Sequence, residues 1–461
     1  MLSKKIIEYL ASHRQEHLEQ LSELLRFPSV SSQSAHEADG LACAEHIAGH
    51  LRGLGFLAEL RPWRKHPILL ARSTPDIAEK SAPTVLIYAH YDVQPPDPVD
   101  LWTSPPFEPT VRDDAIYARG ASDDKGLMMS CINGCEAFIR TAGRLPTNVL
   151  FFVEGEEEMG SPDLEDFVTS AADDLKSDYA LVMDLGFFAP GVPTILTGLR
   201  GLVYLELTLT GPSADLHSGQ HGGAVVNPIN ALAGMISAMH DKSGKVTLPG
   251  FYDDVIEPDR SELDQWESLP FDEGRYIKEV GVEPVGGELD RSVLERRWSR
   301  PTLDCNGIIG GYQGEGAKTV LPAKATAKIS MRLVPNQRPD KVLSSFDKFV
   351  SDNTPAGVRA SVEVSSRSRP VVVPPESPAI TAVKDAMLEA FGAETAIARA
   401  GGSVPIAELI QRVLKVDPIV TGFALPDDNI HSPNEHLQLE QFHTGAVATA
   451  AMLNNLAGIT R

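Results

Sequence analysis

Residues 83–90 run Pro83-Thr-Val-Leu-Ile-Tyr-Ala-His90 and are almost wholly apolar. A strand with one solvent-exposed face alternates apolar and polar residues, whereas a strand that is covered on both faces does not. We therefore predict that this segment is a β-strand inside a sheet with helices on both sides. Residues 149–153 (Val-Leu-Phe-Phe-Val) and 179–183 (Tyr-Ala-Leu-Val-Met) have the same character and predict two more such strands.

Helical patterns alternate with these strands along the chain. One long helix is predicted from about residue 7 to residue 25, because its apolar residues share one face and Phe27-Pro28 ends the pattern. Further helices are predicted at 35–54, 126–142, 379–391 and 439–456. Helices that alternate with buried strands indicate an α/β fold with a central, mostly parallel sheet flanked by helices.

The pattern changes near Gly198. Segments 202–210, 324–334 and 360–366 mostly alternate apolar and polar residues, which is typical of half-exposed antiparallel strands. Helical patterns lie between them, and residues 243–300 form an acidic stretch that we interpret as a helical insertion. We therefore predict an inserted α+β domain at residues 198–377, between two parts of one α/β domain at 1–197 and 378–461.

Composition and charge exclude several classes of function. The chain has 41 Lys and Arg against 63 Asp and Glu, a formal net charge of −22. This charge repels phosphates and anionic lipid, so we expect neither a nucleic acid nor a membrane as a partner. No apolar run approaches the roughly 18 residues of a membrane span, and the N-terminal segment does not have the pattern of a signal peptide. We expect a cytoplasmic protein.

The four cysteines are too few to form a disulfide framework. They are Cys43, Cys131, Cys135 and Cys305, and Cys131 and Cys135 lie four residues apart in a predicted helix. Since free cysteine is among the most buried residue types, we expect four buried, reduced thiols.

Histidines and carboxylates follow the ends of the predicted buried strands. His90-Tyr91-Asp92 ends the first strand, Glu154-Gly-Glu-Glu-Glu158 follows the second, and Asp184 follows the third. Two polar loops, 119–126 and 427–435, carry further acidic residues and a histidine. Because ligands bind beyond the carboxyl ends of strands in open α/β sheets, we predict a functional site there.

The residue types fit a pair of divalent cations. Imidazole and carboxylate ligands without thiolate suit Zn²⁺, with Mn²⁺ or Co²⁺ as alternatives. Three carboxylates and a bridging hydroxide would balance the charge of two such ions, which together polarise a carbonyl and generate hydroxide at neutral pH. A spare carboxylate, Glu157, would take the proton of the water and hand it to a leaving amine. On this reasoning either Asp123 or Asp124 could cap the following helix, and Asp123 could instead offer its two oxygens to two cations.

These segments, in this order and spacing, resemble the M20 family of dinuclear metallopeptidases, most of all the branch of carnosinases, cytosolic non-specific dipeptidases and their bacterial relatives. The resemblance runs from Phe27-Pro-Ser-Val-Ser31 to Asn434-Glu435. It implies a zinc-peptidase-like catalytic domain with an inserted lid and dimerisation domain. It also implies a role for each site residue: His90 and Asp184 on one metal, Glu158 and His431 on the other, Asp123 as the bridge, Asp92 as a buttress of His90, and Glu157 as general base and acid.

The resemblance assigns substrate contacts to the middle domain. Asp215-Leu-His-Ser-Gly219 matches the segment that supplies a histidine, here His217, to the active site of the partner subunit, where it would stabilise the oxyanion. Thr319 and Arg332 match substrate-contacting segments, and Arg332 would hold the terminal carboxylate of the substrate. Ser403 lies in a glycine-rich loop that resembles another substrate contact. A homodimer follows from this assignment.

We therefore expect a hydrolase that cleaves dipeptides or similar small peptides with a free C-terminal carboxylate. The alternative within the family is an amidohydrolase for N-acyl or N-carbamoyl amino acids. A non-catalytic binding protein with the same fold would need a broken ligand set, and the sequence has none missing. A structural protein that binds Ca²⁺ is disfavoured, because Ca²⁺ takes oxygen ligands and two histidines belong to the set.

Overall fold

The structure is a computed structural model and describes residues 1–459. The chain forms two compact units, which we describe separately. Unit 1 comprises Met1–Thr197, Val373–Ala398 and the described residues from Pro405 onward. Unit 2 comprises Gly198–Val372 and Arg399–Val404.

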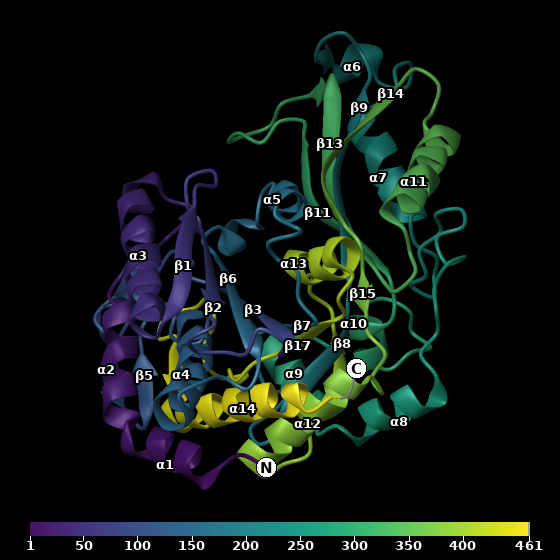
Figure 1. The fold of residues 1–461 in the computed structure, drawn as a ribbon. Helices are drawn as coiled ribbons and strands as arrows, with labels where there is room; N and C mark the ends of the chain where they lie inside the picture. Colours follow the sequence, from purple (N-terminus) through teal and green to yellow (C-terminus); the bar gives the residue numbers. More distant parts are fainter. Residues whose placement is uncertain (460–461) are drawn as a thin grey trace. The chain divides into compact units, whose positions relative to one another are not determined.

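Unit 1 is built on a central sheet whose strands run in the order β1-β2-β6-β3-β7-β17-β8 (Figure 1). The strands β3, β6, β7 and β17 are parallel to their neighbours within this group, whereas β1, β2 and β8 are antiparallel to theirs. Their bounds are β1 Phe56–Arg61, β2 Ile68–Ser73, β3 Thr84–His90, β6 Asn148–Glu154, β7 Tyr179–Val182, β8 Thr194–Leu199 and β17 Pro418–Thr421. The predicted mostly parallel sheet is thus confirmed.

Helices cover this sheet. Helix α3 packs against β1 and β2, α4 packs against β3, and α14 packs against both α4 and α12. Nearly every side chain of α4 from Lys125 to Phe138 is buried, and Gly143 ends that helix in the left-handed conformation, where glycine has no steric penalty. The helices are α1 Lys4–Ser12, α2 Arg14–Leu25, α3 Glu37–Gly53, α4 Lys125–Ala142, α5 Leu164–Ser170, α12 Pro378–Phe391, α13 Pro405–Leu409 and α14 Leu439–Ala457.

The prediction of one long N-terminal helix is wrong, because the chain breaks between α1 and α2 at His13. The hydroxyl of Ser12 donates a hydrogen bond to the carbonyl of Tyr9 at 2.9 Å, and His13 leaves the helical conformation with φ −109° and ψ 14°. Serine side chains that bond to nearby backbone in this way compete with the helix ladder.

A small sheet brings the C-terminal loop next to the loop before α4. Strand β18 (His436–Gln438) pairs with β5 (Ala115–Tyr117), which pairs with β4 (Thr110–Arg112). This pairing holds the 427–435 loop beside residues 118–124. In the central sheet, His90 at the end of β3 lies opposite Glu154 at the end of β6. Long-range pairing therefore gathers the carboxyl ends of the strands and both polar loops.

Unit 2 is built on a four-stranded antiparallel sheet in the order β11-β13-β9-β14. The two central strands, β9 (Gly201–Thr210) and β13 (Lys324–Leu333), alternate buried and half-buried residues, as predicted. Their buried face packs against α7 (Pro228–Ala238) and α11 (Pro339–Asn353) around Leu205, Ile329 and Phe346. The outer strands are β11 Thr302–Gly310 and β14 Arg359–Ser368.

The rest of unit 2 consists of short elements. Strands β10 (Leu216–His217) and β12 (Val320–Leu321) pair with each other, and α6 (Ser218–His221) follows β10. Residues 243–300 contain three short helices, α8 Arg260–Ser268, α9 Glu273–Val280 and α10 Val293–Trp298. The short strand β15 (Val371–Val372) pairs with β8, as does β16 (Ala396–Ala400), whose first three residues belong to unit 1.

The cysteines are all free thiols, and three of them are buried. The expectation of four buried thiols is wrong for Cys305, which is exposed. Cys305 lies on the edge strand β11, at a bulge where the register with β13 shifts between Cys305 and Gly307. Within residues 1–459, every helix falls short of the length and apolarity needed to cross a membrane.

Candidate active site

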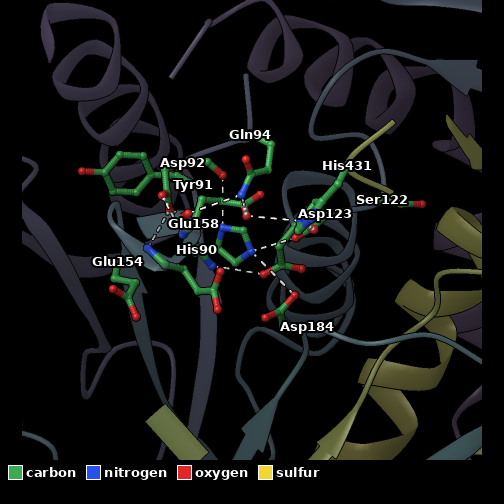
Figure 2. A network of polar contacts seen from close by, with 12 residues as sticks. His90, Tyr91, Asp92, Gln94, Ser122, Asp123, Glu154, Glu158, Asp184 and His431 are labelled. Carbon is green, nitrogen blue, oxygen red and sulfur yellow. Dashed lines mark hydrogen bonds and ion pairs between the residues drawn. The ribbon is translucent and has the colours of Figure 1, made fainter. Parts of the chain in front are cut away.

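His90 is the residue around which the site is built. It ends β3 and is fully buried. Its Nδ1 faces Asp92, at 3.1 Å from the main-chain oxygen and 3.3 Å from Oδ1. Its Nε2 points the other way, at 2.9 Å from Asp123 Oδ1 and 3.6 Å from Asp184 Oδ1 (Figure 2). A carboxylate or carbonyl behind one ring nitrogen leaves the other free to act as a metal ligand.

Asp123 lies between two histidines. Its Oδ1 faces His90, while its Oδ2 lies 2.9 Å from Nε2 of His431. The same nitrogen of His431 is 3.2 Å from Glu158 Oε2 (Figure 2). The two oxygens of one carboxylate thus face two different imidazoles, which is the arrangement that a carboxylate shared by two cations requires.

The ligand atoms fall into two adjoining groups. One contains His90, Asp124 and Asp184, and the other contains Asp123, Glu158 and His431. Within each group, one ligand atom of every residue lies within 4.8 Å of the others. The sequence prediction left Asp124 out, although it lies in the same loop as Asp123.

Asp92 holds the ends of two strands together. It is fully buried, and its carboxylate accepts hydrogen bonds from the backbone N–H groups of Glu157 at 3.2 Å and Glu158 at 3.1 Å. The hydroxyl of Ser31 donates a third hydrogen bond to Asp92, at 2.7 Å. Asp92 therefore orients His90 and the Glu157–Glu158 turn at the same time.

The loop of Asp123 is fixed by a second carboxylate. Glu435 accepts hydrogen bonds from the backbone N–H groups of Ser122 and Asp123, and from Arg119 Nη1 at 2.6 Å. Burial raises the pKa of Glu435 to about 7, against the opposing charge of Arg119. Gln94, in turn, donates to Glu158 Oε2 at 2.8 Å. Only tertiary contacts reveal Arg119, Gln94 and Glu435 as supports of the site, although Arg119 and Glu435 lie within segments that the sequence analysis singled out.

The charges of the cluster are poorly neutralised by the protein itself. Burial, more than any neighbour, raises the pKa of Glu157 to about 9, and Asp184 adds to the rise. Burial likewise raises the pKa of Asp184 to about 6 and holds that of Asp124 well above its usual range. His431 shows the converse effect, because hydrogen bonds to Asp123 and Glu158 raise its pKa to about 10.

These features fit divalent cations. Asp124 Oδ1 is buried and has no hydrogen-bond partner among the described residues, although the other oxygen accepts from the backbone of His90 at 3.1 Å. An uncompensated oxygen in a buried carboxylate cluster is costly unless a cation neutralises it. The donors are imidazole nitrogens and carboxylate oxygens, which suit Zn²⁺ and related ions.

The predicted substrate contacts of unit 2 form two pairs. His217 is exposed at the end of β10, and the backbone N–H of the next residue, Ser218, donates to the carbonyl of Thr319 at 3.1 Å. Arg332, on β13, donates through Nη1 to Ser403 Oγ at 2.9 Å. Both pairs join segments that are far apart in the sequence but belong to the same unit.

An α/β sheet with two adjoining groups of histidine and carboxylate ligands beyond its parallel strands is the architecture of a dinuclear metal-dependent hydrolase. The profile described as Peptidase family M20/M25/M40 matches residues 86–455. The Cys-Gly metallodipeptidase dug1 of Schizosaccharomyces pombe is 32% identical over 99% of this chain and 98% of its own. The Beta-Ala-His dipeptidase of Homo sapiens is 28% identical over 99% and 93%, respectively. The chain therefore belongs to the M20/M25/M40 peptidase family.

Solved structures agree with this membership. The di-peptidase Dug1p from Saccharomyces cerevisiae has a TM-score of 0.80 at 28% identity, with 99% of each chain covered. An M20 family metallo-carboxypeptidase from Sulfolobus solfataricus, Sso-CP2, has a TM-score of 0.86 at 31% identity and covers 96% of this chain and 100% of its own. The similarity thus extends over nearly the whole chain and over both of its units.

Proposed function

We propose that this protein is a metal-dependent dipeptidase that hydrolyses the amide bond of dipeptides and similar small peptides with a free C-terminal carboxylate. The observation that carries the proposal is Asp123, whose two oxygens face His90 and His431, with Glu157 beside them. The relatives named above, which are called a Cys-Gly metallodipeptidase and a Beta-Ala-His dipeptidase, support the substrate class.

Two divalent cations would occupy the site, with zinc as the preferred metal and manganese or cobalt as alternatives. His90 and Asp184 would hold one, Glu158 and His431 the other, and Asp123 would bridge them. When bound, such ions polarise the scissile carbonyl and lower the pKa of a water molecule. The two groups of ligand atoms around His90 and His431 support this division.

Glu157 would move the proton. Neighbouring cations favour the ionised form of a carboxylate, so Glu157 would accept the proton of the attacking water on a carboxylate oxygen. It would then donate that proton to the nitrogen of the leaving amine. Asp92 would keep Glu157 and Glu158 in place through their backbone N–H groups.

Unit 2 would recognise the substrate. Arg332 and Ser403 would bind the terminal carboxylate, Thr319 would contact the peptide, and His217 of each subunit would stabilise the oxyanion in the site of the other. A homodimer is supported by the edges of the unit 2 sheet, where β11 and β14 expose Ile308, Ile309 and Val364. Exposed apolar edge strands are common sites of pairing between chains.

We further propose that the protein works in the cytoplasm on small molecules, without nucleic acid or membrane partners. The formal charge of −22 opposes binding to phosphates and anionic lipid. The free, buried thiols of Cys43, Cys131 and Cys135 suit a reducing compartment.

The test is amine release by the purified protein after chelation of metals and addition of Zn²⁺ or Mn²⁺. The substrates are free dipeptides and matched N-acetyl and N-carbamoyl amino acids, and Asp123→Asn serves as the metal-site control. We expect metal-dependent hydrolysis of the free dipeptides, which Asp123→Asn abolishes. Preferential hydrolysis of the acylated amino acids would overturn the substrate class, and activity without metal would overturn the mechanism.

A further inference from the structure

Arg200 makes several hydrogen bonds to the glycine-rich loop of unit 2. The backbone N–H of Arg200 donates to Gly402 O at 3.2 Å, and its Nε donates to Gly401 O at 2.9 Å. Ser403 Oγ donates to Arg200 O at 2.5 Å. Arg200 also donates through Nη1 to Arg300 O at 3.4 Å. Three consecutive loop residues are thus fixed by both the main chain and the side chain of Arg200.

These contacts determine how Ser403 meets Arg332. The hydroxyl hydrogen of Ser403 points to the carbonyl of Arg200, so the lone pairs of its oxygen accept from Arg332 Nη1 at 2.9 Å. A hydroxyl has one donor and two acceptor positions, and this geometry assigns the donor. The guanidinium of Arg332 is therefore held at a fixed orientation by Ser403, which is itself held by Arg200.

The packing leaves little freedom in this arrangement. A Cβ atom on Gly401 would lie 2.7 Å from Arg200 Nη2 and 2.8 Å from Arg297 O, closer than real Cβ atoms approach other atoms. The loop needs glycine at position 401 because the guanidinium of Arg200 occupies the space that a side chain would take.

The positive charge of the two guanidinium groups is only partly offset by the carboxylate of Asp304, which acts on both of them. Both are partly buried, and within residues 1–459 their hydrogen bonds go to main-chain carbonyls and a hydroxyl rather than to carboxylates. Burial first, and then the charge of Arg332, lowers the pKa of Arg200 to about 10, with Asp304 opposing the change. A partly buried pair of like charges is stabilised when an anion binds beside it.

We propose that Arg200 is a positioning residue for carboxylate recognition: it holds Gly401 and Ser403 so that Arg332 presents its guanidinium to the terminal carboxylate of the substrate. This inference rests on the proposed function for the identity of the anion. It predicts that Arg200 sets the preference for substrates with a free carboxylate over the same substrates with a terminal amide. Lysine cannot replace it, because a single ammonium group cannot reproduce the planar fork that bonds both Gly401 O and Arg300 O.

The experiment compares Arg200→Met, Arg200→Lys and Gly401→Ala with the wild type, using the metal-loaded enzyme. Arg296→Met is the matched control, since Arg296 is also partly buried in unit 2 and donates to the main-chain carbonyls of Pro284 and Gly286. The substrates are a free dipeptide and its C-terminal amide. We expect each Arg200 variant and Gly401→Ala to raise KM for the free dipeptide about tenfold or more, with kcat within about threefold. KM for the amide should stay within twofold, and the control should change neither.

Two kinetic results would overturn the inference. A rise in KM that is equal for the free dipeptide and the amide would mean that Arg200 only supports the fold. Additive losses of affinity, in which the double variant loses the sum of what Arg200→Met and Arg332→Met lose alone, would mean that Arg200 does not act through Arg332. If it does, the double variant is no worse than Arg332→Met alone.

Direct binding separates this inference from the proposed function. Titration calorimetry uses a dipeptide analogue whose amide is replaced by a reduced –CH₂–NH– bond, with either a carboxylate or an amide terminus. If the wild type hydrolyses no dipeptide but binds the carboxylate analogue about tenfold more tightly, and Arg200→Met removes that preference, the proposed function fails and the inference stands. If the wild type shows no preference between the two analogues, the inference fails.

Discussion

Replacing Ser31 by alanine removes a hydroxyl donor from the buried carboxylate of Asp92. The bond is 2.7 Å long and both side chains are buried. Asp92 then retains the backbone N–H groups of Glu157 and Glu158 as donors. A hydrogen bond to a charged group contributes about 1.5–3 kcal/mol, so we expect the free energy of unfolding to fall by that amount.

Ser29→Ala is the matched control. Ser29 is equally buried, and its hydroxyl donates at 2.6 Å to the main-chain oxygen of Tyr91, a neutral acceptor one residue before Asp92. A neutral hydrogen bond contributes about 0.5–1.5 kcal/mol, so this variant should lose less stability. It should also leave Asp92 and His90 in place, and hence leave the affinity for zinc close to that of the wild type.

The decisive assay is metal affinity, measured by competition with a chromophoric chelator, beside urea unfolding of the metal-free protein. Because Asp92 orients His90 from behind, we expect Ser31→Ala to weaken zinc binding by about 10-fold or more, the lower end of what loss of such a support costs. Equal zinc affinities in Ser31→Ala and Ser29→Ala would refute the reasoning, since the hydroxyl would then support the fold without supporting the ligand.

Four further predictions concern other parts of the protein. Glu157→Gln should keep its metal content and lose about 10²–10⁴-fold in kcat; near-normal turnover would remove Glu157 from the mechanism. Mixed and re-dimerised subunits of His217→Ala and Glu157→Gln should regain partial activity, and no recovery despite proven exchange would mean that His217 does not act across the interface. Arg119→Met should cost about 3–5 kcal/mol in urea unfolding because it leaves Glu435 buried without its partner, and an additional Glu435→Gln should restore part of the loss. Burial lowers the pKa of His443 to about 4, so the unfolded chain takes up a proton at a higher pH than the folded chain does. The free energy of unfolding should therefore fall as the pH drops from about 6.5 to 4. The same dependence of stability on pH in His443→Gln would contradict this.

The pattern of apolar residues was enough to predict three central strands of unit 1 and its longer helices. The strands at Thr84–His90, Asn148–Glu154 and Tyr179–Val182 lie within a few residues of their predicted places, because a strand covered on both faces must be continuously apolar. The break at His13 was missed, since it depends on the hydrogen bond from the Ser12 hydroxyl to the carbonyl of Tyr9, which the spacing of apolar residues does not reveal. Exposure of Cys305 was missed because it depends on an edge position and a bulge.

The site was predictable to the extent that its residues follow strand ends. His90, Glu158 and Asp184 lie there, and chain order alone suggests that they meet. Asp124 was left out because the family resemblance selects its neighbour Asp123, and only the fold aims the side chain of Asp124 at the His90 group. Arg200 lies in no recognisable sequence motif, and its contacts with residues about 200 positions away arise solely from tertiary packing.

The interruption of unit 1 by residues 198–372 has a consequence for biosynthesis. Strands β3, β6 and β7 leave the ribosome early, but β17, which pairs with β7, and the loop of His431 are made only after the whole inserted unit. Until then the nascent sheet keeps one side of β7 unpaired and lacks one of its two histidines. The hydrolytic centre is therefore completed only after the loop of His431 has been translated, and a chain that is terminated before this loop cannot become an active peptidase.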